Sequence, residues 1–340
     1  MRAAVMREGR LLVEDVPEPV PGIGTVLAET IACGICGSDL HALKHTDQMK
    51  EVAAAAGYPA DLDGDVVMGH EFSARVLELG PGSSGVEPGD VVVSIPLVFG
   101  SAGLAQVGYS TQYPGGYGER MVLSPAFCVK VPNGLDPRRA ALTEPMAVGV
   151  HAVAKSRIEQ GEGAIVLGCG PIGLAIIAAL RLKGAEPIIA ADFSPKRRSL
   201  ASLMGAHESI DPRERAAIDA WTAAAGVRTP VIFEAIGVRG ILDDAMLWAP
   251  RNARIVVAGV CMEPDPIRPL IGVSKELSLH FVLGYDPMEF NQTLGYIADG
   301  SIDVEPLITG EVGISEVPAA FESLSDPEAH AKILVKPALG

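Results

Sequence analysis

The first 140 residues carry short apolar runs that are interrupted by glycine, proline or aspartate. Segments 91–95 (VVVSI), 121–123 (MVL) and 127–131 (FCVKV) are examples of these runs. Strands of this length with such punctuation are typical of an antiparallel, barrel-like unit. We therefore expect the chain to begin with a β-rich domain.

From residue 145 onward, short buried runs alternate with segments of helical periodicity. The strands are expected at 164–167, 187–192, 231–237 and 254–260, and the helices at 171–184, 196–205 and 239–248. Strand–helix–strand order at this spacing predicts a parallel sheet with crossover helices. The expected fold class is therefore α/β, with a doubly wound parallel-sheet domain joined to the β-rich domain.

Short mixed elements return after residue 284, and segment 329–337 ends in a strand that is able to rejoin the first domain. We therefore expect one domain made of residues 1–145 and 285–340, and a second made of residues 146–284. The acidic, alanine-rich segment 45–65 is an insertion. It is interpreted either as a surface loop with one helical turn or as a lid or subunit contact beside a functional site.

Composition excludes several classes of function. The chain of 340 residues has a formal net charge of −15 and no run of Lys or Arg, so we expect no nucleic-acid partner. The N-terminal MRAAVMREGR lacks the apolar core of a signal peptide, and the apolar stretches are too interrupted to span a membrane. Five cysteines, an odd number, do not suggest a disulfide framework, and a reducing, cytoplasmic setting is the default.

The segment GCGPIG after the strand at 164–167 has the spacing of a dinucleotide-binding turn. Gly168 permits the tight turn, Gly170 lets a pyrophosphate approach the backbone, and Gly173 lets helix and strand pack closely. Pro171 and Ile172 begin the helix, whose free N–H groups and positive dipole end suit phosphates. This segment predicts a Rossmann domain that binds a dinucleotide.

Asp192 ends the next strand, 19 residues after Gly173. A carboxylate in that place accepts hydrogen bonds from the adenosine ribose and repels a 2′-phosphate, so NAD is favoured over NADP. Arg197 and Arg198 follow closely and favour the opposite cofactor. We expect NAD, with Arg197 beside the cofactor.

Cys33 and Cys36 form a C-x-x-C pair, but the remaining cysteines, Cys128, Cys169 and Cys261, offer no second pair. A four-cysteine zinc site is therefore not expected, and the βαβ setting of a thioredoxin-type motif is absent. The alternative is a site that combines one thiolate with an imidazole and carboxylates, a mixture that zinc accepts.

The order of the motifs is similar to that of a known family. C-G-x-C-G-S-D-x-H (33–41), G-H-E (69–71), G-D-x-V (89–92), E-P (144–145) and the glycine-rich turn resemble the medium-chain zinc-dependent alcohol dehydrogenases. The resemblance covers nearly the whole chain and implies a GroES-like catalytic domain beside the Rossmann domain. Glu144–Pro145 resembles the branch of sorbitol, threonine and butanediol dehydrogenases, where other members have a cysteine.

The resemblance also implies the metal ligands. Cys36 and His70 would bind a catalytic zinc, and either Glu71 or Glu144 would supply the third ligand, the other carboxylate acting through water. Asp39 would orient His70 from behind. Many members hold a second, structural zinc with four cysteines, but the matching stretch 96–113 has none, so one catalytic zinc is expected.

Further roles follow from the same resemblance. Ser38 would take the proton of the alcohol and pass it by way of the cofactor to His41, whose imidazole titrates near neutrality. Val260 would contact the nicotinamide through its backbone, and Lys332 would touch the pyrophosphate. Relatives form dimers or tetramers through the Rossmann domain, so a homodimer or homotetramer is expected.

The expected activity is hydride transfer between an alcohol and NAD, interconverting the alcohol with a ketone or aldehyde. The substrate would be a small polyol, vicinal diol or secondary alcohol, made acidic by the zinc ion. One alternative is a zinc hydrolase, with Glu71 or Glu144 as general base, which leaves the glycine turn unexplained. Others are a zinc-free quinone or enoyl reductase, which would not need the metal ligands, and a non-catalytic NAD-binding protein.

Overall fold

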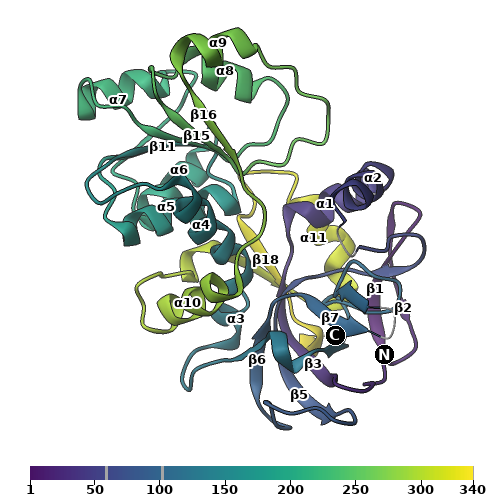
Figure 1. Ribbon diagram of the computed structural model, residues 1–340. Helices are drawn as coiled ribbons and strands as arrows, with labels where there is room; N and C mark the ends of the chain where they lie inside the picture. The colour runs from purple at the N-terminus through teal and green to yellow at the C-terminus, as the bar shows by residue number, and fades with distance from the viewer. Residues whose placement is uncertain (58–59, 101–102, 340) are drawn as a thin grey trace. The chain divides into compact units, whose positions relative to one another are not determined.

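The computed structural model describes residues 1–57, 60–100 and 103–339, and these divide into two compact units. Unit 1 comprises Met1–Glu144, Ile308–Asp326 and Lys332–Gly340, and unit 2 comprises Pro145–Leu307 and Pro327–Ala331. Each unit is described by itself (Figure 1). Parts of the predicted insertion 45–65 and of the stretch 96–113, together with the last residue, lie outside the described residues.

Unit 1 is built on a seven-stranded sheet with the order β10-β6-β5-β3-β18-β17, in which β9 also pairs with β3. Its strands are β3 (Val26–Gly34), β5 (Glu71–Leu79), β6 (Val91–Ser94), β9 (Arg120–Leu123), β10 (Cys128–Lys130), β17 (Ile308–Val312) and β18 (Lys332–Val335). All pairs are antiparallel except β17 with β18. The β-rich first domain is confirmed, and the C-terminal strand returns to it as expected, since β18 pairs with β3.

Smaller elements complete unit 1. β1 (Arg2–Arg7), β2 (Arg10–Asp15) and β4 (Val66–Val67) form a three-stranded sheet, and β7 (Leu97–Gly100) pairs with β8 (Gly103–Gln106). The helices are α1 (Gly37–Lys44), α2 (Thr46–Ala56), α3 (Pro137–Ala140) and α11 (Val317–Ser323), with short 3-10 turns at Pro125–Phe127, Ile314–Glu316 and Pro337–Leu339.

Close packing between β3 and β5 determines the position of the buried Glu71 side chain. Gly34 is opposite Glu71 in the register, and Cys33 is opposite Phe72. A Cβ atom on Gly34 would collide with Oε2 of Glu71, so glycine is required at this position. The end of β3 and the start of β5 therefore meet with Glu71 held directly against the neighbouring strand.

Unit 2 contains a six-stranded parallel sheet with the order β13-β12-β11-β14-β15-β16. Its strands are β11 (Ala164–Leu167), β12 (Ile188–Ala191), β13 (Glu208–Ile210), β14 (Val231–Glu234), β15 (Arg254–Val257) and β16 (Ser278–Phe281). In sequence order this arrangement is 3-2-1-4-5-6, the order of a dinucleotide-binding sheet. The α/β fold class is confirmed.

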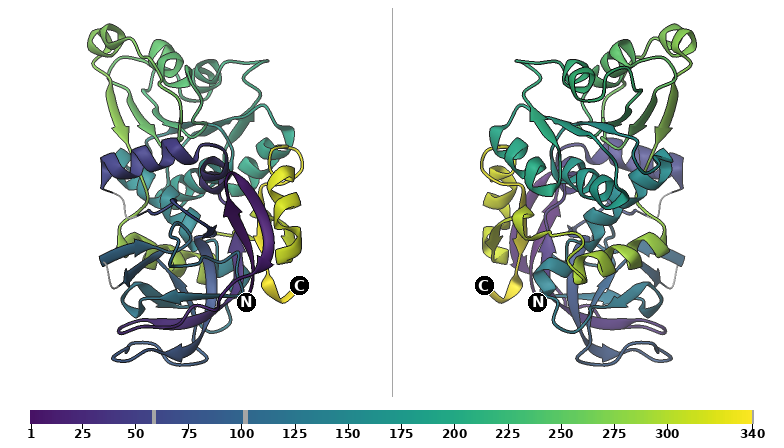
Figure 2. Two further views of the ribbon diagram at one scale, coloured as in Figure 1. Left: turned by 90° about the vertical axis from the view of Figure 1, so that its right-hand side faces the viewer. Right: turned by 90° about the vertical axis from the view of Figure 1, so that its left-hand side faces the viewer.

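Helices cover both faces of the unit 2 sheet (Figures 1 and 2). They are α4 (Thr143–Ser156), α5 (Pro171–Lys183), α6 (Pro195–Met204), α7 (Ala217–Ala225), α8 (Ile241–Trp248), α9 (Pro269–Lys275) and α10 (Pro287–Ala298), with a 3-10 turn at Glu305–Leu307. Trp221 of α7 and Met246 of α8 pack with Ile165, Ile189 and Ile255 of the strands in one buried cluster. This rigid core supports the turn between β11 and α5.

One domain boundary and the length of one helix differ from the expectation. Residues 285–307, expected in the first domain, group with unit 2. The physical reason is that α10 is held to α4, where His151 Nδ1 lies 2.6 Å from Glu289 Oε2. The insertion also forms a longer helix than one turn, since α2 runs from Thr46 to Ala56 with no buried residue.

Among the residues that the structure describes, no helix is long and apolar enough to cross a membrane.

Candidate active site

Three residues with metal-binding side chains meet in unit 1. Cys36 is the N-cap of α1 and lies two residues after the end of β3. His70 directly precedes β5, and Glu71 is the first residue of that strand. One ligand atom from each of the three lies within 4.8 Å of the other two. Thiolate, imidazole and carboxylate are all zinc ligands, and three protein ligands are typical of catalytic rather than structural zinc. The donor set therefore fits a zinc ion.

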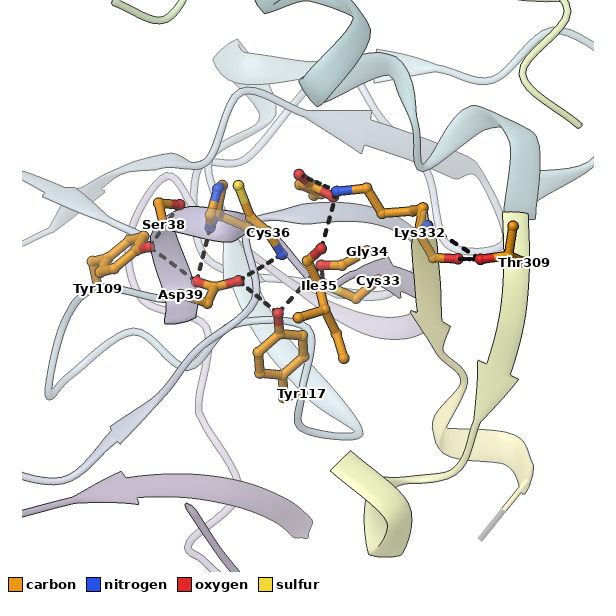
Figure 3. Close-up of polar contacts among 12 residues, drawn as sticks. Cys33, Gly34, Ile35, Cys36, Ser38, Asp39, Tyr109, Tyr117, Thr309 and Lys332 are labelled. Atoms are coloured by element: carbon orange, nitrogen blue, oxygen red, sulfur yellow. Dashed lines mark hydrogen bonds and ion pairs between the residues drawn. The ribbon is translucent and has the colours of Figure 1, made fainter. Parts of the chain in front are cut away.

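Asp39 lies behind His70, as the resemblance implied. Its Oδ1 is 3.4 Å from His70 Nδ1, which leaves Nε2 as the ring nitrogen free for a cation. Asp39 is fully buried and also accepts hydrogen bonds from the Cys36 backbone at 3.2 Å and the Tyr117 hydroxyl at 2.6 Å. The Tyr109 hydroxyl lies 3.0 Å from Asp39 Oδ1 (Figure 3). Asp39 is thus a fixed support for the imidazole.

Tyr109 and Tyr117 were not predicted from the sequence. They lie in the glycine-rich segment 108–118, about which no motif gives information, although aromatic residues there could have suggested a packed loop. Tyr109 is 4% exposed and its ring centroid is 5.3 Å from that of His70. The Tyr109 and Tyr117 hydroxyls both bond to the Asp39 carboxylate, and Tyr117 also donates to the Gly34 carbonyl at the end of β3.

Burial and charge set the protonation of the metal-free cluster. Burial raises the pKa of the Cys36 thiol, and the charge of Glu71 adds to the rise. Burial alone would lower the pKa of His70, but the charge of Asp39 holds it well above its usual range. Burial alone would raise the pKa of Asp39, but the charge of His70 lowers it. A cation that binds here must therefore displace protons.

The expectation for Lys332 needs correction. It is the first residue of β18 and is 2% exposed, whereas the sequence placed it just before the final strand. Its ammonium donates to Glu71 Oε1 at 2.8 Å and Oε2 at 2.6 Å, and to the Ile35 carbonyl at 3.0 Å (Figure 3). Because β18 pairs with β3, the lysine is directed to the buried carboxylate of unit 1.

Glu144 lies outside the cluster formed by Cys36, His70 and Glu71. Its charge is close enough to contribute to the raised pKa of Lys332: burial lowers that pKa, and Glu71, Cys36 and Glu144 together raise it. Of the two carboxylates that the sequence offered as a third ligand, Glu71 is the one beside Cys36 and His70.

Ser38 and His41 lie three positions apart in α1 and so share one side of the helix. Ser38 Oγ is 3.0 Å from the Tyr109 hydroxyl. His41 is partly buried, and burial together with the charges of His45 and Lys44 lowers its pKa. His41 can therefore act as a free base at a lower pH than an exposed imidazole.

The glycine turn of unit 2 has the geometry that the sequence predicted. Gly168 has φ of +88°, and a Cβ atom on Gly173 would collide with the Gly168 carbonyl oxygen. A Cβ atom on Gly170 would meet nothing within 4 Å, so the backbone is open at that point. Pro171 and Ile172 form the first turn of α5, with Gly170 as its N-cap. This helix start offers N–H groups to an anion.

Asp192 follows β12 and bonds back to the turn. Its Oδ2 accepts from the Cys169 N–H at 2.8 Å and its Oδ1 accepts from the Ser194 N–H at 2.8 Å. Nε of Arg197 is buried with no hydrogen-bond partner among the described residues. An orphaned donor beside the turn is consistent with a ligand that carries acceptors.

Val260 lies in the loop after β15 and is 49% exposed. Its backbone packs against Gly237, where a Cβ atom would lie 2.5 Å from the Val260 nitrogen. The loops after β14 and β15 therefore contact each other through their backbones. A contact between the Val260 backbone and a nicotinamide stays a prediction.

Known proteins share both the domains and the fold. Residues 22–133 match the alcohol dehydrogenase GroES-like domain, and residues 171–299 match the zinc-binding dehydrogenase domain. The (R,R)-butanediol dehydrogenase of Bacillus subtilis (strain 168) is 31% identical, with 96% of each chain covered. A crystal structure of 2R,3R-butanediol dehydrogenase from Bacillus subtilis superposes with a TM-score of 0.84 at 29% identity, covering 99% of each chain.

Two further relatives extend the comparison. Sorbitol dehydrogenase of Bacillus subtilis (strain 168) is 26% identical, covering 99% of this chain and 97% of its own. A zinc-binding dehydrogenase structure from Sinorhizobium meliloti 1021, bound to NADP, has a TM-score of 0.83 at 26% identity, covering 99% of each chain. The motif order, both domain matches and the full-length relatives agree: the chain belongs to the family of medium-chain, zinc-binding alcohol dehydrogenases.

Proposed function

We propose that this protein is a zinc-dependent dehydrogenase that oxidises a small vicinal diol, polyol or secondary alcohol with NAD. The observation that carries the proposal is the convergence of Cys36, His70 and Glu71, whose ligand atoms lie within 4.8 Å of one another. The names of the relatives, a butanediol and a sorbitol dehydrogenase, support the substrate class.

Cys36, His70 and Glu71 would hold a single zinc ion. A zinc ion at these residues supplies Lewis-acid chemistry that lowers the pKa of an alcohol hydroxyl. Asp39 keeps the imidazole in one orientation, and Lys332 balances the charge of Glu71 in the buried site. No cysteine is present in the stretch 96–113, which supports one zinc rather than two.

The proton of the alcohol is handled by residues of α1. Ser38 Oγ is the acceptor that faces the substrate hydroxyl, and His41 on the same side of the helix releases the proton to water. The lowered pKa of His41, caused by burial and by His45 and Lys44, supports its role as a base.

Unit 2 would bind the cofactor, whose nicotinamide ring accepts the hydride. The open backbone at Gly170 and the start of α5 suit the pyrophosphate, and Asp192 suits the ribose hydroxyls. We favour NAD because a 2′-phosphate next to the Asp192 carboxylate would be repelled. The buried Nε of Arg197, which has no hydrogen-bond partner among the described residues, supports a contact of Arg197 with the same ligand.

The test is the formation of reduced nicotinamide across a panel of alcohols, with NAD and with NADP, before and after complete metal removal. Activity that is lost with the metal and restored by zinc supports the proposal. A zinc-free reductase would stay active without metal, and a zinc hydrolase would not need the nicotinamide. Cys36→Ser should lose both activity and bound zinc.

We also infer that the protein forms a homodimer or homotetramer through unit 2. β16 is at the edge of the parallel sheet and pairs only with β15 among the described strands. Phe281 and Leu283 at its end are each 71% exposed. An apolar strand edge that is left open favours pairing with a second copy.

A further inference from the structure

The Tyr109 hydroxyl connects the carboxylate behind His70 to the serine of α1. It lies 3.0 Å from Asp39 Oδ1 and 3.0 Å from Ser38 Oγ. Tyr117 bonds to the other oxygen of Asp39, Oδ2, at 2.6 Å, and to the Gly34 carbonyl at 3.3 Å. In Figure 3, Ser38 and Tyr109 lie on one side of Asp39 and Tyr117 lies on the other. Of the two tyrosines, Tyr109 is the one bonded to Ser38.

The number of hydrogens on this network determines its direction. A phenol has one hydrogen to donate, whereas a carboxylate oxygen only accepts. Asp39 is fully buried and accepts hydrogen bonds from the Cys36 backbone and the Tyr117 hydroxyl. We therefore expect Tyr109 to donate its hydrogen to the same carboxylate. A hydrogen bond to a charged group is about twice as strong as one to a neutral hydroxyl. The oxygen of Tyr109 is then left to accept the hydrogen of Ser38.

We propose that Tyr109 is a positioning residue that makes Ser38 a hydrogen-bond acceptor toward the substrate. In the resting site, Tyr109 holds the hydrogen of Ser38, so Ser38 presents oxygen lone pairs to the reacting group. That hydrogen leaves Tyr109 for the relay to His41 only when Ser38 takes up the proton of the alcohol. A hydroxyl can donate to these lone pairs, but a carbonyl oxygen cannot. The site therefore prefers the alcohol to the corresponding carbonyl compound, and Tyr109 determines that preference. This inference rests on the proposed function, because it assigns Ser38 to the substrate.

The test uses two inhibitors of matched size that do not react. A tertiary alcohol has no hydrogen to give up as hydride. An N,N-dialkyl carboxamide presents a carbonyl that the enzyme does not reduce, and it has no N–H group to donate to Ser38. Tyr109→Phe frees the hydrogen of Ser38, so we expect the carboxamide to bind about fivefold tighter, the equivalent of one neutral hydrogen bond. Binding of the tertiary alcohol should change little, because Ser38 still accepts.

Tyr117→Phe is the matched control. It removes a hydroxyl from Asp39 without touching Ser38, so the ratio of the two inhibition constants should stay at the wild-type value. Ser38→Ala should weaken the tertiary alcohol alone, and Tyr109→Phe should add nothing in the Ser38→Ala background. If Tyr109→Phe shifts both inhibitors equally, or acts as strongly without Ser38, the inference is overturned.

A second measurement needs no activity. The shifts in urea midpoint caused by Ser38→Ala and Tyr109→Phe in metal-free protein should be non-additive, because the two hydroxyls bond to each other. Additive shifts would overturn the hydrogen-bond assignment. Wild-type protein without zinc-dependent alcohol oxidation would overturn the proposed function and the role of Tyr109 with it. Active wild-type protein with an unchanged ratio in Tyr109→Phe would overturn the role of Tyr109 alone.

Discussion

Replacing Lys332 by methionine would leave Glu71 as an unpaired carboxylate in the interior of unit 1. The lysine is 2% exposed and the glutamate 1%, and two hydrogen bonds of 2.8 and 2.6 Å join them. Breaking a buried pair by removing one partner costs about 3–5 kcal/mol. That loss lowers the folding equilibrium constant of unit 1 by a factor of roughly 10² to 4 × 10³, since 1.4 kcal/mol is tenfold.

The loss should be measured in metal-free protein and should lower the melting temperature of unit 1 by about 10 °C. Both tryptophans, Trp221 and Trp248, are in unit 2, so their fluorescence does not report on unit 1. Hydrogen exchange of peptides from β3, β5 and β18 is therefore the appropriate probe. The double variant Glu71→Gln/Lys332→Met should recover most of the loss, because no buried charge remains uncompensated.

The stability of Lys332→Met can also be compared with that of the wild-type protein in the presence of zinc. Without the lysine, the Glu71 carboxylate has no competing partner and is available to a cation beside Cys36 and His70. Zinc should therefore stabilise Lys332→Met more than it stabilises the wild-type protein. An equal zinc effect in both proteins would argue against Glu71 as a ligand. A loss below about 1 kcal/mol without metal, the level of a surface pair, would refute the reasoning about the buried charge.

Three other changes probe separate parts of the molecule. Asp192→Ala should weaken NAD binding by about tenfold or more, because hydrogen bonds to a charged group are lost. It should also reduce the preference for NAD over NADP. If titration shows equal losses of affinity for both cofactors, the role of Asp192 is contradicted. His41→Ala should slow alcohol oxidation most at the acidic side of the pH range. There hydroxide is scarce, whereas the wild-type imidazole, with its pKa lowered by burial and by neighbouring positive charge, is still a free base. Added imidazole should restore part of kcat/KM, and an identical pH profile in both proteins would exclude the relay. Phe281→Lys, at the open end of β16, should lower the oligomeric state seen by light scattering while zinc content is retained; an unchanged mass would place the interface elsewhere.

Contiguous motifs are the part of the candidate site that can be predicted from the sequence. The glycine turn, Asp192 and the fragment from Cys36 to His41 each combine residue type with a spacing that local backbone geometry demands. The same reasoning led to Cys36, His70 and Glu71, which the structure brings together. The sequence could not choose between Glu71 and Glu144 as the third ligand, because the choice depends on which of them lies beside Cys36 and His70 in the fold.

Other features depend on contacts between distant residues and could not be predicted. Lys332 is 261 positions from its partner Glu71, and Tyr109 is 70 positions from Asp39. No periodicity encodes such a pairing. The grouping of residues 285–307 with unit 2 has a similar cause, because a tertiary contact between α10 and α4 holds this segment there.

β18 lies between β3 and β17 in the main sheet of unit 1, although more than 290 residues separate β3 from β18 along the chain. During synthesis on the ribosome, β3 and β5 emerge early, but β18, the neighbour of β3 in the sheet, emerges only near the end of the chain. Unit 2 has most of its chain available sooner, so it can fold first while the nascent metal-binding half still lacks the lysine that neutralises Glu71. A carboxyl-terminal deletion that removes β18 should consequently produce chains with a folded cofactor unit, an open sheet edge and a strong tendency to be recognised by chaperones.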